Sequence, residues 1–333
     1  MNYCNINKEC VTEPGFIEIT SSDINTDEIS TTLLGRLYRI LEINSKQMEG
    51  KLFFKDAVLL NGSISLKVKW VESNLVSSIY QGDIVSIRAL LPLKSLNGCV
   101  EIIRLVRYQQ PVASFNLFDT IPHHWVKDRS LIKRAAELIS RLSEPHRLLL
   151  NAIFWDSSRF ERFCRQPSSM IGHHSEPNGN LKHTIEVAEE MRQLCLTRNY
   201  ANLDLGVLAA FLHDCGKADE YVSNGKSGWS MTDRGKLLGH KVSAFEWIVS
   251  AVTQWHILLP KDHYVGLLHI LTAVPNAPDW MGLRAPVTPE SLLLSMADRL
   301  SGHDSLMEQT VSPTGGFGRY HKHLKSSPFT VRG

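Results

Sequence analysis

Histidines and aspartates of the kind that bind metals are scattered through the second half of the chain. His213 and Asp214 are adjacent and close an apolar helical run from Leu205 to Leu212. The other members are His183 upstream and His240, His269 and Asp298 downstream, each in a separate apolar segment. Imidazole and carboxylate ligands together suit divalent metals that activate water. This set therefore predicts a metal-dependent hydrolytic site.

The His213–Asp214 pair is the hardest part of this set to explain without a metal. At the end of an apolar helix it would bury two costly polar groups at once, and buried polar groups require partners. A metal ion supplies partners for both. Asp298 also follows an apolar run, where an unpaired buried carboxylate would be very costly. A lone helix histidine such as His183 is more often a packed or surface residue, so the order of the whole set carries more than any one member.

Helices must position these residues. From residue 126 to 303 apolar residues recur at the 3.6-residue spacing of amphipathic helices, as at Leu131 and Ala135. Pro145 can start a further helix in its first turn. Gly216 permits a sharp turn just after the His-Asp pair. Residues 126–303 are therefore predicted to form an all-α domain.

The chain before this domain is typical of β-structure. Residues 63–70 alternate strictly between polar and apolar, which is the mark of a half-buried strand. Four further β-rich runs are separated by turn pairs such as Asn61-Gly62 and Asn97-Gly98. Five strands suit a small closed barrel, for which the OB-fold is the commonest candidate. The predicted fold class is α+β and multidomain, with a five-stranded OB-like β-barrel followed by the all-α domain.

The outward face of this barrel is predicted to carry basic residues beside aromatic ones. The candidates for nucleic-acid binding are Lys67, Lys69, Trp70 and Arg88. Basic side chains interleaved with aromatic rings suit a groove for single-stranded nucleic acid. A solvated barrel face with core aromatics is the alternative. On this segment alone the alternative is favoured, because OB-folds serve many roles.

Five segments follow from these patterns. They are a polar N-terminal segment at 1–30, the barrel at 31–108, a linker at 109–125, the helical domain at 126–303 and a tail at 304–333. The tail contains several glycines and basic residues and is predicted to be flexible.

Composition and charge are those of an ordinary globular protein. Of the 333 residues 43% are hydrophobic and 21% are charged, and the net charge is +2, so any nucleic-acid-binding surface must be local. This length allows two domains and a sizeable core. No apolar run approaches the about 20 residues of a membrane span, and the N-terminus lacks a signal-peptide pattern. The six cysteines form no C-x-x-C pair. A reducing cytoplasm, with no membrane partner, is therefore expected.

The order of the histidines and aspartates on a helical domain resembles that of the HD superfamily of metal-dependent phosphohydrolases. Over most of residues 33–303 the chain also resembles the YhaM-type 3′–5′ exoribonuclease family, which joins an OB-fold to an HD domain. The most specific pieces are the loop Gly172 to Ser175, the block His213 to Lys217 and the segment Gly235 to His240. The loop Ser175 to Asn180 is similar to that of HD-type relaxase domains of conjugative elements, so single-stranded DNA stays open as a substrate.

The resemblance implies which residues bind metal. One ion would be held by His183, His213, Asp214 and Asp298, and a second, bridged by Asp214, by His240 and His269. The family carries a further His-His pair shortly after the position of His269, where this chain has Thr272-Ala273-Val274-Pro275. We therefore expect a weaker second site. The ligands are compatible with Mn²⁺, Mg²⁺, Fe²⁺ or Zn²⁺, and the resemblance favours Mn²⁺.

The predicted catalytic residues are Asp214, Lys217, His173 and His174. Metal chemistry of this kind polarises the scissile phosphate and lowers the pKa of a bound water for in-line attack. Lys217 would offset charge on the phosphate in the transition state. His173 and His174 would contact the substrate or protonate the leaving 3′-oxygen.

Three classes of function are compatible with these features. The favoured class is a metal-dependent 3′–5′ exonuclease of single-stranded nucleic acid, RNA before DNA, because small nucleotides need no barrel to hold a strand. The second class is an HD phosphohydrolase of small nucleotides, and a relaxase-like HD nuclease of a mobile element is an alternative within the nuclease class. A binding protein with a decayed site is the third class, and the intact order of ligands argues against it. A homo-oligomer is left open by the sequence.

Overall fold

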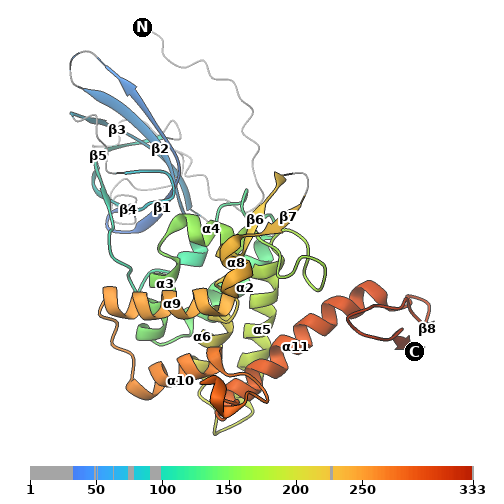
Figure 1. Ribbon diagram of the computed structural model, residues 1–333. Coiled ribbons are helices and arrows are strands. Elements are labelled where there is room, and N and C mark those ends of the chain that lie inside the picture. Colours follow the sequence, from blue (N-terminus) through green and yellow to red (C-terminus); the bar gives the residue numbers. More distant parts are fainter. Residues whose placement is uncertain are drawn as a thin grey trace. The chain divides into compact units, whose positions relative to one another are not determined.

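A computed structural model describes residues 33–331, apart from residues 49, 51, 63, 74–78, 91–98 and 226–227. The chain divides into two compact units, Met1–Gln109 and Gln110–Gly333, which are described separately (Figure 1). The polar segment predicted at 1–30 lies outside the described residues.

The first unit is a closed five-stranded barrel. Its strands are β1 (Leu37–Gln47), β2 (Phe53–Asn61), β3 (Ile64–Glu72), β4 (Ile84–Leu90) and β5 (Cys99–Arg107). The strand order is β1-β2-β3-β5-β4, closed by pairing of β4 with β1. All neighbours are antiparallel except β3 and β5, which are parallel. The predicted five-stranded OB-like barrel is therefore confirmed.

Alternation along the strands fills the barrel. On β3, Leu66, Val68 and Trp70 point into the hydrophobic core, whereas Lys67 is exposed and Lys69 partly exposed on the other face. Lys55 of β2 is buried and forms an ion pair with Glu72. The period-2 pattern that predicted the strand thus also decides which side chains face inward.

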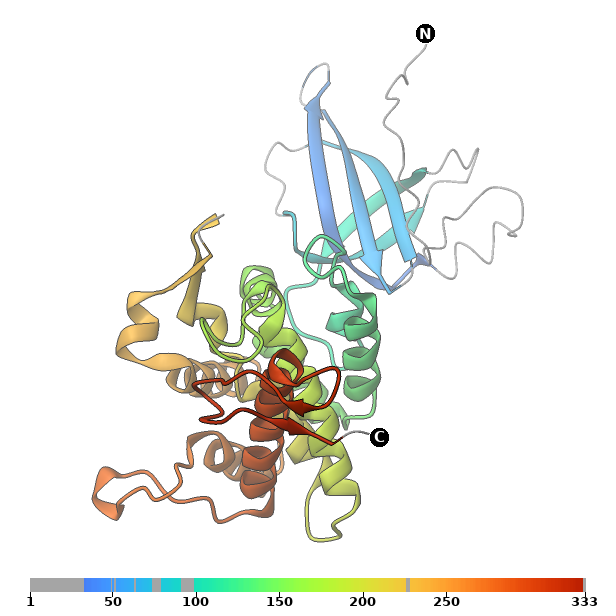
Figure 2. The same cartoon turned by 90° about the vertical axis from the view of Figure 1, so that its right-hand side faces the viewer.

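The second unit is mostly helical (Figure 2). Its α-helices are α2 (Arg129–Ser140), α3 (Glu144–Phe154), α4 (Ser157–Arg165), α5 (Gly179–Leu196), α6 (Leu203–Leu212), α7 (Lys217–Glu220), α8 (Asp233–Leu237), α9 (Gly239–Gln254), α10 (Lys261–Thr272) and α11 (Pro289–Thr310). Short strands β6 (Tyr221–Ser223) and β7 (Trp229–Met231) form a hairpin between α7 and α8. Among the described residues, no helix has the length and apolar character to cross a membrane.

Helix α6 lies at the centre of this unit. It is apolar on all sides, and every residue from Leu205 to Leu212 is buried. It packs against α3, α5, α10 and α11. A helix that is hydrophobic all round is a core helix, so the residues at its C-terminal end emerge in the interior rather than on the surface.

The segment predicted as a linker at 109–125 is part of the helical core instead. It contains the short 3-10 helix η1 (Leu117–Thr120), which Asn116 caps with its side chain. The ring of Phe118 is fully buried in edge-to-face contact with Phe154, Phe160, Phe163 and Phe211. Aromatic burial on this scale fixes the segment in place.

The helical domain continues past the boundary predicted at residue 303. Helix α11 continues to Thr310 and buries Ser305 and Leu306 in its last turns. The strands β8 (Gly316–Phe317) and β9 (Phe329–Thr330) then pair as a short antiparallel sheet. The helix therefore extends beyond the predicted boundary.

Candidate metal centre

Three helices bring metal-type side chains to one point. His213 is the C-cap of the central helix α6, His183 lies on α5, and Asp298 lies on α11. One ligand atom from each of these residues lies within 4.8 Å of the others. The Nε2 atom of His183 is 3.3 Å from Nε2 of His213 and 3.1 Å from Oδ1 of Asp298. Asp214, next along the chain, places Oδ2 3.4 Å from Nε2 of His213.

The hydrogen-bond partners of the two histidines fix where their protons lie. Nδ1 of His213 is 2.7 Å from the carbonyl oxygen of Ala210, so this nitrogen is the donor. Ser301 donates its hydroxyl to Glu186 at 2.7 Å. Its oxygen therefore accepts from Nδ1 of His183 at 3.0 Å. In the neutral form of each ring the second nitrogen, Nε2, is then the one without a proton.

When both imidazoles are neutral, two nitrogen lone pairs and a carboxylate therefore face one another. Burial lowers the pKa of His183, which opposes addition of a second proton to that ring. Such a group of acceptors is repulsive unless a cation joins them. Neutral imidazole nitrogens and carboxylate oxygens are ordinary ligands of divalent metals. The residues of this site thus fit a divalent cation, held by His183, His213, Asp298 and Asp214.

Asp214 is held ionised by its neighbours. Its side chain is 7% exposed, and burial alone would raise the pKa of the carboxyl. Lys217 and the surrounding histidines outweigh burial and hold the pKa of Asp214 well below its ordinary value. Nζ of Lys217 donates to Asp214 Oδ2 at 2.5 Å and to Ser168 Oγ at 3.1 Å. The lysine predicted to contact a phosphate is therefore buried and occupied by this carboxylate.

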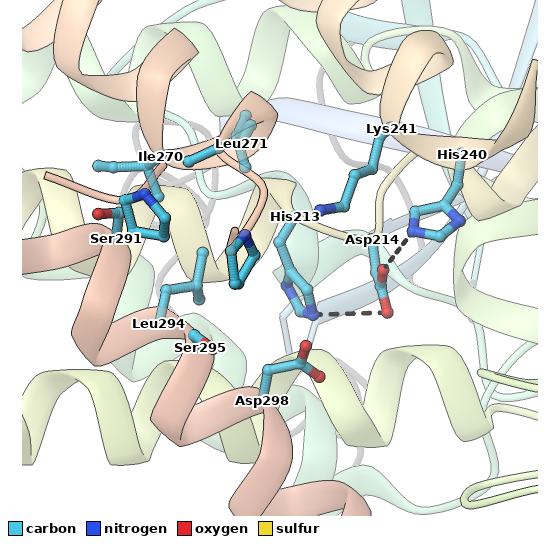
Figure 3. Close-up of a pocket in the computed structure, with 13 residues that line it drawn as sticks. His213, Asp214, His240, Lys241, Ile270, Leu271, Ser291, Leu294, Ser295 and Asp298 are labelled. Atoms are coloured by element: carbon cyan, nitrogen blue, oxygen red, sulfur yellow. Dashed lines mark ion pairs between the residues drawn. The ribbon is translucent and has the colours of Figure 1, made fainter. Parts of the chain in front are cut away.

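His240 approaches the other oxygen of Asp214. Its Nε2 is 3.3 Å from Asp214 Oδ1 (Figure 3). Its Nδ1 is 2.8 Å from Oε2 of Glu220. A glycine makes this approach possible. A Cβ atom on Gly216 would lie 2.0 Å from the carbonyl oxygen of His240. Gly216 therefore serves close packing of α9 as well as the turn that the sequence suggested.

His269 does not join this group. Its Nε2 accepts a hydrogen bond from the backbone amide of Val287 at 3.1 Å. It is also absent from the described side chains that line the pocket beside His240. The second ion site predicted from His240 and His269 is therefore not assembled by these two histidines, because one of them is engaged with a loop.

The two loop histidines have different positions from those expected of a proton donor. His174 is 1% exposed, and its Nε2 lies 3.0 Å from Glu186. It therefore supports the residues behind His183 and does not face substrate. The ring of His173 lies 5.1 Å from that of His183. Burial, together with nearby positive groups, lowers the pKa of His173 to about 4, so this imidazole is neutral at pH 7.

A pocket of about 140 Å³ opens beside the metal-type residues. His213, Asp214, His240 and Asp298 lie on one side of it, with the amine of Lys241 nearby (Figure 3). The remaining lining side chains are mainly apolar and come from α10, α11 and the loop between them: Ile270, Leu271, Ala273, Pro275, Pro286 and Leu294. The pocket therefore joins a polar, metal-type floor to an apolar wall.

The four barrel residues predicted to bind nucleic acid differ in exposure and in their partners. Trp70 is 6% exposed in the barrel core and has no face on which a base could stack. Lys69 forms an ion pair with Glu101 at 2.8 Å. Lys67 is exposed on the same face of β3. Arg88 lies over the ring of Tyr108, with 5.7 Å between its guanidinium carbon and the ring centre. The outward face is thus mixed in charge around Lys69.

Four residues of the site were missed by the sequence analysis. Glu186 and Ser301 lie behind His183, Glu220 holds His240, and Lys241 lines the pocket. Two of them carried a helical signal: Glu186 follows His183 by three positions, and Ser301 follows Asp298 by three. Residues at this spacing share a helix face. Glu220 carried no such signal, because it lies on a different helix from His240.

Comparison with known proteins agrees with this geometry. Residues 180–302 match the family described as HD domain. No curated protein and no solved structure matches the chain. The matched range contains all six of the histidines and aspartates predicted as metal ligands. The second unit of this protein therefore contains an HD domain at residues 180–302, preceded in the chain by an OB-like barrel.

Proposed function

We propose that the protein is a metal-dependent phosphodiesterase that removes nucleotides from the 3′ end of a single-stranded nucleic acid, with RNA favoured over DNA. The observation that carries the hydrolase part is the convergence of His183, His213 and Asp298, whose ligand atoms lie within 4.8 Å of one another. HD domains are typical of metal-dependent phosphohydrolases. The strand end and its polarity rest on the resemblance and on the OB-like barrel.

The residues of the chain divide the work of such a reaction. His183, His213, Asp214 and Asp298 would hold a divalent ion, with Mn²⁺ favoured. When bound, that ion supplies Lewis acidity towards phosphate and water. Lys217 keeps Asp214 ionised, and so keeps the carboxylate available as a ligand. The side chain of Asp298 is 47% exposed, so the centre is open to a substrate on this side.

His240 is the histidine best placed to move a proton. Its side chain is 27% exposed at the pocket, whereas His174 is buried and His173 is neutral at pH 7. Its Nδ1 is fixed by Glu220, which leaves Nε2 directed at Asp214 and the pocket. A proton on Nε2 can pass to a leaving oxygen in the pocket. The role predicted for the two loop histidines is therefore assigned to His240.

A phosphohydrolase of small nucleotides is the second candidate. It is favoured by the outward face of the barrel, where Lys69 is paired with Glu101 and Trp70 is buried. A groove for single strands gains affinity from unpaired cations and exposed aromatic rings. In this alternative the barrel would support folding or assembly.

The test uses the full chain with Mn²⁺ and, in parallel, Mg²⁺, Fe²⁺ and Zn²⁺. The substrates are 5′-labelled single-stranded RNA, the same sequence as DNA, and free nucleotides. We expect a ladder of 5′-labelled products that shortens one nucleotide at a time, and none with Asp214→Asn. Cleavage of free nucleotides alone would support the second candidate. Absence of all cleavage by a metal-loaded protein would contradict both.

A further inference from the structure

Two lysines lie near the metal centre, and their surroundings differ. Nζ of Lys217 is buried between Asp214 and Ser168, which already accept its hydrogen bonds. Lys241 follows His240 on the first turn of α9, is exposed, and lines the pocket. No carboxylate among the described residues forms an ion pair with it. Lys241 is therefore a lysine in this pocket whose charge is available to a ligand.

The wall that faces this lysine is mainly apolar, with Ser291 and Ser295 as its polar members. Ile270 and Leu271 come from α10 and Leu294 from α11, and Figure 3 places them on the side of the pocket away from His240. Leu271 and Leu294 are 5% and 6% exposed, so they are firmly packed and present a fixed surface. Ligand pockets commonly combine such an apolar lining with a few convergent polar groups. This pocket suits a molecule with an anionic end and a flat apolar end.

We propose that Lys241 binds the phosphate of the substrate, while the wall formed by Ile270, Leu271 and Leu294 receives the base of the terminal nucleotide. This inference rests on the proposed function and specifies how its substrate is recognised. An ammonium group beside a phosphate contributes a charge-assisted hydrogen bond. The mainly apolar wall contributes burial of the base, an effect that is not specific for any one base. Cleavage is therefore expected to depend little on which base ends the strand.

Binding of two phosphonates separates the lysine from the wall. Phenylphosphonate and methylphosphonate carry the same anionic group and cannot be hydrolysed at the P–C bond, but only one has a ring. Isothermal titration calorimetry with the Mn²⁺-loaded full chain should show phenylphosphonate bound roughly tenfold more tightly, because the ring is removed from water. Equal affinities for the two probes would overturn the role of the wall.

The lysine is tested by Lys241→Gln, which alters an exposed side chain and should leave the fold intact. We expect both phosphonates to bind roughly tenfold more weakly, with their ratio preserved. Metal content, measured by elemental analysis, should be unchanged, and Lys241→Arg should restore most of the affinity. The matched control is Lys236→Gln, because Lys236 is exposed on α8 and lies 3.5 Å from Asp233. It should bind both probes like the parent.

Failure of this inference can be told apart from failure of the proposed function, because calorimetry requires no turnover. If Lys241→Gln binds both probes like the parent, the phosphate role of Lys241 is wrong even where the parent cleaves RNA. If the parent binds the probes as expected but cleaves neither strands nor nucleotides, the pocket assignment stands as ligand recognition and the hydrolase proposal fails.

Discussion

The barrel and the metal centre treat their charged groups in opposite ways. On the barrel, Lys55 is paired with Glu72 and Lys69 with Glu101, so each of these lysines has a carboxylate partner in the same sheet. In the metal centre, Nε2 of His183 lies 3.3 Å from Nε2 of His213 and 3.1 Å from Oδ1 of Asp298, so atoms that can accept or bind a cation face one another. Paired charges stabilise the folded barrel. Acceptor atoms that face one another instead indicate a site where a bound cation would supply the missing partner.

Within the metal centre, Lys217 is paired with the carboxylate of Asp214, as the barrel lysines are paired with glutamates. In Lys217→Met the buried carboxylate of Asp214 loses its lysine, so we expect the metal-free protein to lose roughly 3–5 kcal/mol of unfolding free energy. Urea unfolding of parent and variant measures this. A loss below about 1 kcal/mol would show that the pair is screened like a surface ion pair. The double variant Lys217→Met/Asp214→Leu should recover much of the stability without activity.

Glu220 tests whether His240 is positioned or merely adjacent. Without the carboxylate the imidazole can rotate, so Glu220→Ala should reduce kcat by roughly 10- to 100-fold with little change in KM. Glu220→Gln keeps an oxygen that can accept from Nδ1 of His240 and should retain most of the activity. Equal losses in the two variants would indicate that the charge of Glu220 matters rather than its position.

The strands and the ligand set could be predicted from the sequence because both are local or periodic. The strict alternation in residues 63–70 gives β3 and also puts Trp70 on the same face as Leu66 and Val68. The prediction that Trp70 binds nucleic acid on the outward face therefore disagreed with the alternation that predicted the strand. The burial of Phe118 was harder to predict, because the apolar residues around it, such as Phe115, Leu117 and Ile121, are too few to define a strand or a long helix by their spacing.

The hydrogen-bond partner of each site residue could not be predicted, because it depends on residues that are distant in the sequence and meet only in the fold. His269 lies in the expected helix, yet the backbone amide of Val287, from the loop before α11, takes its nitrogen. Lys217 follows Asp214 by three positions and was expected to face substrate, but packing turns it to Ser168 and Asp214. Spacing indicates which residues can meet, and the fold decides which of them do.

The barrel lysines allow a smaller test of the same contrast. Lys67 is exposed, whereas Lys69 is paired with Glu101. If the barrel grips a strand, Lys67→Gln should weaken binding of a long single strand about threefold and reduce the slope of log affinity against log salt by about 0.7. Lys69→Gln should change both less. Fluorescence anisotropy at several salt concentrations measures both, and no salt dependence in the parent would remove the barrel from substrate binding.

The smallest expected effect concerns acid stability. The pKa of His173 is lowered to about 4, below the ordinary value of about 6.5. The unfolded chain therefore takes up a proton first, and stability that is complete above about pH 6.5 is lost as the pH falls towards 4. In His173→Gln the metal-free protein should lose less stability between pH 7 and pH 5 than the parent. Urea unfolding at the two pH values checks this, and an identical loss would assign the effect to other groups.

The most direct measurement is the metal content of the loaded protein. The parent, His183→Ala, Asp298→Asn and His269→Ala are incubated with Mn²⁺, freed of excess ion by gel filtration and examined by elemental analysis, with circular dichroism as the control for folding. The account predicts at least one ion per chain in the parent and in His269→Ala, and almost none in the folded His183→Ala and Asp298→Asn proteins. A parent that retains no ion, or ligand variants that retain as much as the parent, would contradict it.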